Sequence, residues 1–202
     1  MNFDLRKYII AAALTVLIWV MALTPLGYIP FFGVDITLIC IPVIIGAIAL
    51  GLPYGLFLGL MFALTSLFMA LMGRAGVLLA PLLDLPLPMY LTIFIPRLLI
   101  PIFTWLACKA TAKWKPPLSY GVSTLVGALS NTVFFLGFAY FLAGDQISAS
   151  FQMSNHDLLA ALGEILRLNG LLEAAVAVLV CVPVSLVLKR IIDARQDMEW
   201  HE

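Results

Sequence analysis

The chain has 202 residues, of which 63% are apolar and only 11% are charged, and its mean hydropathy is +1.11. A soluble domain carries about a quarter charged residues, so this composition excludes an ordinary globular protein and predicts an integral membrane protein in a lipid bilayer. Eleven basic residues balance eleven acidic ones. The chain therefore has no net charge with which to recruit nucleic acid.

Six apolar runs approach the roughly 20 residues that a helix needs to cross a bilayer. The runs are continuous rather than alternating, which predicts helices and not the strands of a barrel. We therefore expect an all-α integral membrane protein, a six-transmembrane-helix bundle that forms one membrane domain over residues 1–202. The predicted helices cover about 8–24, 36–52, 54–73, 89–108, 118–142 and 168–190, and the predicted outer loops cover 25–35, 74–88 and 143–167.

The distribution of basic residues predicts how the bundle is oriented. Cytoplasmic segments of membrane proteins carry an excess of Lys and Arg, and a cytoplasmic N-terminus places eight basic residues inside against three on or toward the outside. Both termini are therefore predicted to be cytoplasmic. The inner group is Arg6, Lys7, Lys109, Lys113, Lys115, Lys189, Arg190 and Arg195, and the outer group is Arg74, Arg97 and Arg167.

Two of the outer loops carry local patterns. The proline-rich run 81–88 predicts an extended segment that lies over the helix ends. In the last loop, Leu158, Leu162 and Ile165 repeat at helical spacing after Ser154, which is a favourable N-cap residue. The sequence therefore predicts a short outer helix before the last span.

Several kinds of chemistry lack their sequence signatures. No phosphate-binding loop is present, so we do not expect the chain to hydrolyse ATP by itself. Cys40, Cys108 and Cys181 lie far apart, and the two histidines are His156 and His201. This spacing fits neither a metal centre nor a disulfide framework. The sequence predicts no enzymatic activity, no metal site and no cofactor.

Four polar residues lie within or at the ends of the predicted spans. Arg97 lies about 12 Å below the outer end of its helix, and Asn131 lies at a similar depth in the next one. Asn169 and Glu173 are four residues apart and share one helix face. Arginine offers a two-pronged donor to a carboxylate, and asparagine supplies both a donor and an acceptor. We predict one outward-opening site for a small anion that also carries hydroxyl and amide groups.

Thr37 and Tyr54, together with Asp35, are predicted to be further wall or lid groups of this site. Charged residues inside a membrane usually mark function. The alternative is that Arg97 and Glu173 pair with each other and staple the bundle, and that the buried amides only bridge helices.

Several segments resemble one family of membrane proteins. The chain resembles the second to sixth helices of the S components of energy-coupling factor (ECF) vitamin transporters. The resemblance lies in the runs 35–51 and 55–67 and in the motifs IPRLLIP, LSNTVFFLG and NGLLEAAVA. The chain looks most like the pantothenate-type member. The resemblance implies a six-helix bundle that binds a vitamin near the outer surface, with loops 25–35 and 74–88 as lids.

The resemblance also implies partners and a location. S components lie in the bacterial plasma membrane and dock on a T subunit that carries two ATPases, which accounts for the missing phosphate-binding loop. The family often shows alanines spaced by four in the first helix as its T-subunit contact. Here Ala11 is followed four residues later by Thr15, which is small but departs from that pattern, and we expect the pair to form the contact.

Pantothenate has one carboxylate, two hydroxyls and an amide, which suit the four buried polar groups, although other vitamins or precursors would fit as well. The rival interpretations are a structural or assembly membrane protein without transport activity and an intramembrane enzyme.

Overall fold

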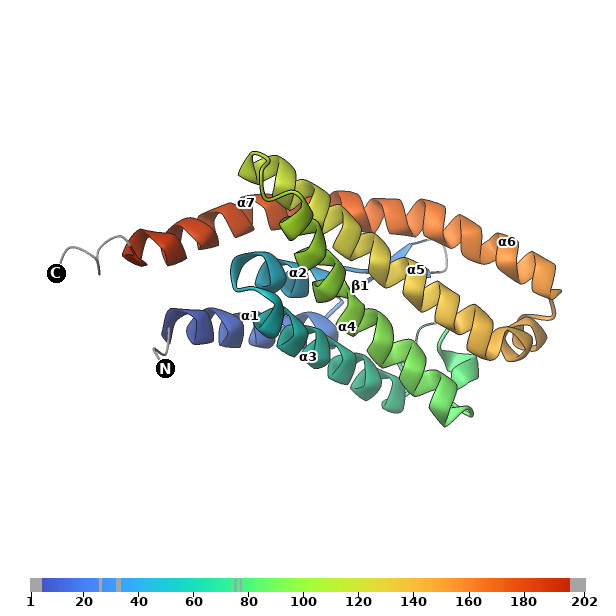
Figure 1. The fold of residues 1–202 in the computed structure, drawn as a ribbon. Helices are drawn as coiled ribbons and strands as arrows, with labels where there is room; N and C mark the ends of the chain where they lie inside the picture. The colour runs from blue at the N-terminus through green and yellow to red at the C-terminus, as the bar shows by residue number, and fades with distance from the viewer. Residues whose placement is uncertain (1–4, 26, 32–33, 75, 77, 197–202) are drawn as a thin grey trace.

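A set of long helices surrounds one short helix and a small β-hairpin in the computed structural model (Figure 1). The structure describes residues 5–25, 27–31, 34–74, 76 and 78–196. In chain order the elements are α1 (Leu5–Leu23), β1 (Tyr28–Phe31), β2 (Val34–Thr37), α2 (Cys40–Ala49), α3 (Leu52–Leu71), the 3-10 turn η1 (Ala80–Leu82), α4 (Pro86–Ala110), α5 (Pro116–Phe151), α6 (Asn155–Ile165), the π-helical turn η2 (Leu166–Gly170) and α7 (Leu171–Gln196).

Five stretches of helix within the described residues are long and apolar enough to cross a bilayer. They are α1, α3, α4, α5 and the continuous α6–η2–α7, and they confirm the predicted membrane bundle of apolar helices. Helices α1, α3 and α4 agree with the predicted bounds to within three residues.

The second predicted span, 36–52, is wrong in its length and partly in its structure. Helix α2 has 10 residues, which is about 15 Å, or half of the hydrocarbon thickness. The first part of the apolar run belongs instead to β2, which pairs antiparallel with β1 so that Tyr28 faces Thr37. A short apolar run does not by itself distinguish a helix from a strand. Residues 26 and 32–33 of the predicted outer loop 25–35 lie outside the described residues.

The fifth predicted span and the loop after it also need correction. Helix α5 continues to Phe151, with a break in its helical geometry at Ala143, whereas the sequence analysis ended it at residue 142. The segment after the break is more polar, so the sequence analysis ended the membrane span there. Polar composition ends a membrane span but does not end a helix. The predicted outer helix is confirmed as α6, and Ser154 accepts the backbone N–H of Asp157 as its cap.

The run 81–88 is not extended as predicted. It contains the end of η1, and α4 begins at Pro86. The backbone N–H groups in the first turn of a helix have no partner within the helix, so proline, which lacks this group, is tolerated there. The prolines at the start of α4 therefore begin a helix instead of preventing one.

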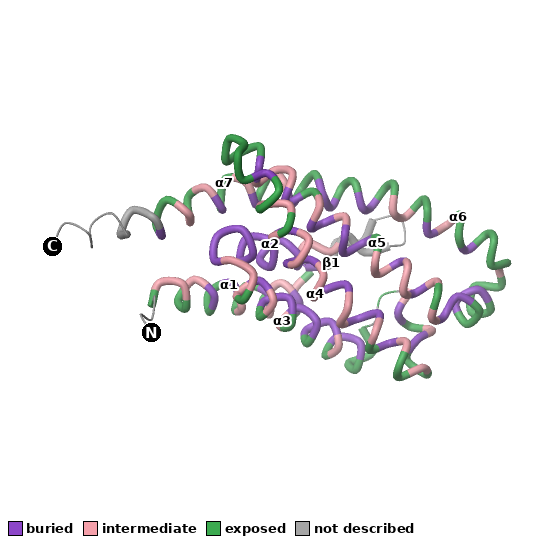
Figure 2. Tube along the Cα trace, viewed as in Figure 1, coloured by how far each residue is buried: buried purple, intermediate pink, exposed green. Residues whose placement is uncertain are grey.

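Helix α2 forms the centre of the bundle. All ten of its residues are buried (Figure 2), and it packs against α1, α3, α4, α5 and α7. Gly51, with φ of +96°, allows the short turn from α2 into α3. Large apolar side chains such as Phe141 and Leu179 are exposed on the outside of the bundle, as expected where helices face lipid.

The start of α1 and the end of α7 lie at the same end of the bundle (Figure 1), which we call the termini end. Arg6 joins them there, because its Nη1 donates to the carbonyl oxygen of Ile191 at 3.1 Å. The assignment of this end to the cytoplasm stays a prediction from the basic residues.

Candidate functional site

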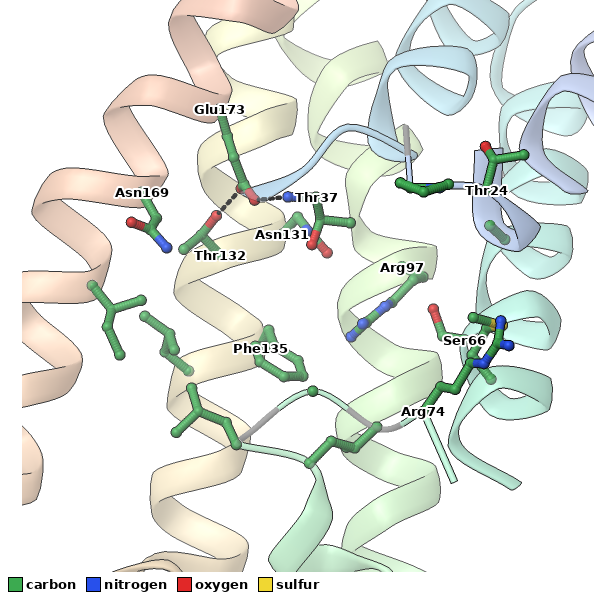
Figure 3. Close-up of a pocket in the computed structure, with 18 of the residues that line it drawn as sticks. Thr24, Thr37, Ser66, Arg74, Arg97, Asn131, Thr132, Phe135, Asn169 and Glu173 are labelled. Carbon is green, nitrogen blue, oxygen red and sulfur yellow. Dashed lines mark hydrogen bonds between the residues drawn. The ribbon is translucent and has the colours of Figure 1, made fainter. Parts of the chain in front are cut away.

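A cavity of about 390 Å³ lies toward the opposite end of the bundle, which we call the cavity end. Its walls come from the end of α1, the last residue of β2, α3 and the loop that follows it, α4, α5 and the α6–α7 region (Figure 3). The polar residues that line it are Thr24, Thr37, Ser66, Arg74, Arg97, Asn131, Thr132, Asn169 and Glu173. Segments from most of the length of the chain therefore bring polar side chains together at one cavity, whose other walls are apolar.

Arg97 projects from α4 into this cavity and is 8% exposed. Its Nη1 donates to the carbonyl oxygen of Thr92 at 3.0 Å. Its guanidinium carbon lies 4.8 Å from the ring centre of Phe135 and 5.3 Å from that of Phe62, distances at which a cation is attracted to an aromatic face. These contacts hold the guanidinium at the cavity wall, and a guanidinium carries five N–H donors in all.

Glu173, in the first turn of α7, binds the hairpin to the bundle. Its Oε1 accepts the backbone N–H of Thr37, and its Oε2 accepts the hydroxyl of Thr132 at 3.0 Å (Figure 3). The carboxylate thus joins β2, α5 and α7, three elements far apart in the sequence. By accepting the Thr37 backbone N–H, Glu173 holds the end of β2 at the cavity wall.

The amides of Asn131 and Asn169 face the same cavity from α5 and η2 (Figure 3). Both residues are 6% exposed. Within the described part of the chain, Oδ1 of Asn131 and Nδ2 of Asn169 have no hydrogen-bond partner. Leaving a buried polar atom unpaired costs about 1–3 kcal/mol, so native proteins rarely do so without a reason. The cavity wall therefore presents one acceptor, Oδ1 of Asn131, and one donor, Nδ2 of Asn169, to a ligand.

The structure brings Arg97, Asn131, Asn169, Glu173 and Thr37 to one cavity, as the sequence predicted for their positions. Their role in binding a substrate is a proposal that we make below.

Tyr54 is not among the lining residues. It lies in the first turn of α3, about 18 Å along the helix from Ser66, and its ring packs edge-on against that of Tyr8 at 5.8 Å. The side chain of Asp35 is not among those that the structure describes.

Sequence reasoning missed five of the polar or aromatic lining residues: Thr24, Ser66, Arg74, Thr132 and Phe135. Serine, threonine and phenylalanine are ordinary residues of a membrane helix, so their types carried no signal. Thr132 could have been found, because it directly follows Asn131 on the helix that faces Glu173.

The pair Ala11 and Thr15 does not form the exposed surface expected of a partner contact. Ala11 is 5% exposed and belongs to the core, and the hydroxyl of Thr15 donates to the carbonyl oxygen of Ala11 at 2.8 Å. The exposed face of α1 contains Ala12, Ala13 and Val16 instead. Sequence spacing identified a stripe of small residues but could not tell which stripe faces the bundle.

The staple interpretation of Arg97 and Glu173 stays an alternative. Both oxygens of Glu173 accept hydrogen bonds, from Thr37 and Thr132.

A bundle of apolar helices that encloses a polar cavity near one end is the architecture of a multi-pass membrane protein that takes up a small molecule. The comparison with family models makes this specific. The model of the ECF transporter substrate-specific component matches residues 6–185, and the chain belongs to that family. The comparison with curated proteins gave no match.

The protein is thus the substrate-specific component of a transporter and not an enzyme. Membership in the family implies a small-molecule substrate and partnership with T and ATPase subunits. The family match also sets aside the assembly-protein and intramembrane-enzyme interpretations.

Proposed function

We propose that this S component binds pantothenate in the cavity and delivers it to the cytoplasm together with a T subunit and two ATPases. In this proposal the protein lies in a bacterial plasma membrane with both termini in the cytoplasm, so that the cavity opens outward. The loops around 25–35 and 74–88 serve as lids, which agrees with Pro25, Arg74 and Leu78 lining the cavity.

The observation that carries the proposal is the set of polar groups presented to one enclosed space. Arg97 supplies N–H donors for a carboxylate. Oδ1 of Asn131 is an acceptor for a ligand hydroxyl, and Nδ2 of Asn169 is a donor for a ligand carbonyl. Pantothenate carries each of these partners: a carboxylate, two hydroxyls and an amide carbonyl.

The size and lining of the cavity support a small, non-aromatic ligand. About 390 Å³ lies at the lower end of the range of roughly 300–1,000 Å³ that is usual for small-molecule sites. Phe135 is the one aromatic residue among the described lining residues, and its ring packs against Arg97. A vitamin with a flat ring system would have no pair of aromatic side chains here between which to stack.

The surface for the T subunit is assigned to the exposed side of α1. Ala12, Ala13 and Val16 are exposed there, which places small and apolar groups on the outside of the bundle. This face replaces Ala11, which the structure buries.

The proposal is tested with the full chain in detergent by measuring its melting temperature with a panel of vitamins. A ligand at about 100 times its dissociation constant adds about 2.7 kcal/mol to the native state, so we expect a clear upward shift with pantothenate. Pantothenol, which replaces the carboxylate by an alcohol, is the matched ligand and should give a much smaller shift.

Arg97→Ala is expected to abolish the difference between pantothenate and pantothenol, because it removes the partner of the carboxylate. Arg167→Ala is the matched control, since this arginine is exposed and pairs with Glu164 outside the cavity. A shift with a different vitamin that also depends on Arg97 would keep the site and reject pantothenate. A pantothenate shift that Arg97→Ala leaves intact would reject the site.

A further inference from the structure

A second cavity, of about 480 Å³, lies at the termini end of the bundle. Three lysines from three different helices line it, namely Lys7 of α1, Lys109 of α4 and Lys189 of α7. Lys7 and Lys189 are half-buried and Lys109 is exposed. The sequence analysis used these residues only to orient the bundle, and the transport cycle proposed above assigns them no role.

The charged side chains among the described residues that line this cavity are all basic. Helix α5 begins at the cavity with its positive end, whereas α2 and α4 end there with their negative ends. Each helix end counts as roughly half an elementary charge, so the three ends offset only a small part of the three ammonium groups. An anion is therefore the ligand that this space favours.

The other walls of the cavity suit a lipid rather than a freely soluble anion. Trp105, Trp114 and Tyr120 line it, and these residue types gather at the level of the lipid headgroups. Lys109 Nζ lies 4.9 Å from the Trp105 ring centre. The end of α2 adds an apolar wall at Ile48 and Leu50. The space thus combines cationic groups with aromatic and apolar surface, as a phospholipid headgroup and its glycerol region require.

We propose that this cavity binds the phosphate headgroup of an anionic phospholipid, such as phosphatidylglycerol, and that Lys7, Lys109 and Lys189 contact the phosphate. Basic pockets between membrane helices are known to hold acidic headgroups. The site is separate from the vitamin cavity, and it does not depend on which molecule the protein transports.

The test measures the selectivity of the full chain for phosphatidylglycerol over phosphatidylcholine. Both lipids carry brominated acyl chains and are added to the protein in zwitterionic micelles, and quenching of tryptophan fluorescence reports binding. A Trp19→Phe, Trp200→Phe background leaves Trp105 and Trp114 as the reporters. We expect selectivity for phosphatidylglycerol, with an affinity about fivefold weaker for each lysine that is replaced by glutamine.

Replacing all three lysines is therefore expected to weaken phosphatidylglycerol binding about a hundredfold. The charge-matched control replaces Lys113, Lys115 and Arg190, which are exposed and do not line the cavity, and it should retain the selectivity. The single variant Lys109→Gln changes an exposed side chain and keeps the test decisive if the triple variant does not fold.

An equal loss in the control and in the triple variant would overturn the proposal, because the selectivity would then come from general attraction to basic residues. Equal affinity of the unmodified protein for both lipids would overturn it as well. Full competition by millimolar inorganic phosphate would show a site for soluble anions and reject the lipid. None of these outcomes depends on vitamin binding, so the two proposals fail independently.

Discussion

Several buried hydroxyls near the termini end of the bundle bond to their own helices, and Thr111 and Ser119 also bond to each other at 2.7 Å, whereas two buried amides at the cavity end lack partners among the described residues. The hydroxyls of Thr104, Thr111 and Ser123 each donate to the carbonyl oxygen four residues earlier, at 2.7–2.8 Å. At the cavity end, Asn131 and Asn169 each keep an amide atom that the described residues do not satisfy. The difference follows from chemistry, because a hydroxyl can bond the preceding turn, while an amide has more groups to satisfy than that turn offers.

Tight packing around Gly55 contrasts with the open space of the two cavities. A Cβ atom at Gly55 would lie 2.8 Å from Cβ of Pro101 and 2.9 Å from that of Ala47, so α3 is held tightly between α4 and α2. We call these surroundings of Gly55 the closed region. The cavities at the two ends leave about 390 Å³ and 480 Å³ open, so the closed region stabilises the bundle while the cavities offer space for the proposed ligands.

The largest effect is expected for Arg97→Ala. A hydrogen bond to a charged group contributes about 1.5–3 kcal/mol, so the dissociation constant for pantothenate should rise about 10- to 150-fold while the protein still melts cooperatively. Isothermal titration calorimetry measures the constant, with Arg167→Ala as the control. Unfolding of the variant without any ligand-bound state would instead favour a structural role for this arginine.

Gly55→Ala is the converse experiment at the closed region. The added methyl group has no space, and overpacking costs about 1–3 kcal/mol, so the melting temperature should fall while the affinity of the folded protein changes little. Gly137→Ala is the matched control, because nothing lies within 4 Å of its added Cβ and alanine favours a helix. A similar loss in both variants would contradict the tight packing at Gly55.

Glu173→Ala tests the connection between the hairpin and α7. The variant removes the acceptor of the Thr37 backbone N–H, and we expect that amide to exchange with solvent at least about tenfold faster. Hydrogen–deuterium exchange with mass spectrometry measures this at the peptide that contains Thr37. Glu164→Ala, at an exposed carboxylate that pairs with Arg167, should leave the exchange unchanged. Unaltered exchange in Glu173→Ala would show that other contacts hold the hairpin.

The smallest effects are expected for Asn131→Ala and Asn169→Ala. Each should weaken ligand binding about 2- to 12-fold, which corresponds to one hydrogen bond of about 0.5–1.5 kcal/mol. The ligand-free protein should be at least as stable as before, because an unpaired buried group is removed. Asn155 offers the contrast, since its amide bonds both Ser148 and Asp145, and Asn155→Ala should lower stability without changing affinity. Lower stability of the ligand-free Asn131 and Asn169 variants would mean that these amides hold helices together.

The sequence could predict those parts of the fold that depend on residue type alone. Long apolar runs identified α1, α3 and α4 closely, and the Ser154 cap and the spacing of Leu158 and Leu162 identified α6. The apolar run that contains α2 was misread, because the composition of a short apolar run does not distinguish a strand from a helix.

The candidate site shows the same limit. The rarity of Arg97, Asn131, Asn169 and Glu173 in an apolar chain made them conspicuous, and the structure places them on one cavity. Tyr54 and Ala11 were chosen from their sequence neighbourhood. Their helices direct them elsewhere, Tyr54 toward Tyr8 and Ala11 into the core.

The amino-acid sequence by itself determined that this is a membrane protein, that it consists of apolar helices, and that a few polar side chains within those helices need hydrogen-bond partners. These properties follow from the cost of placing polar groups in lipid, which acts on each segment separately. Tertiary structure alone decided that Glu173 bonds Thr37 and Thr132, that α2 is short and central, and that the Asn131 and Asn169 amides border one cavity. Those outcomes depend on how segments far apart in the chain pack together, and no local pattern records that.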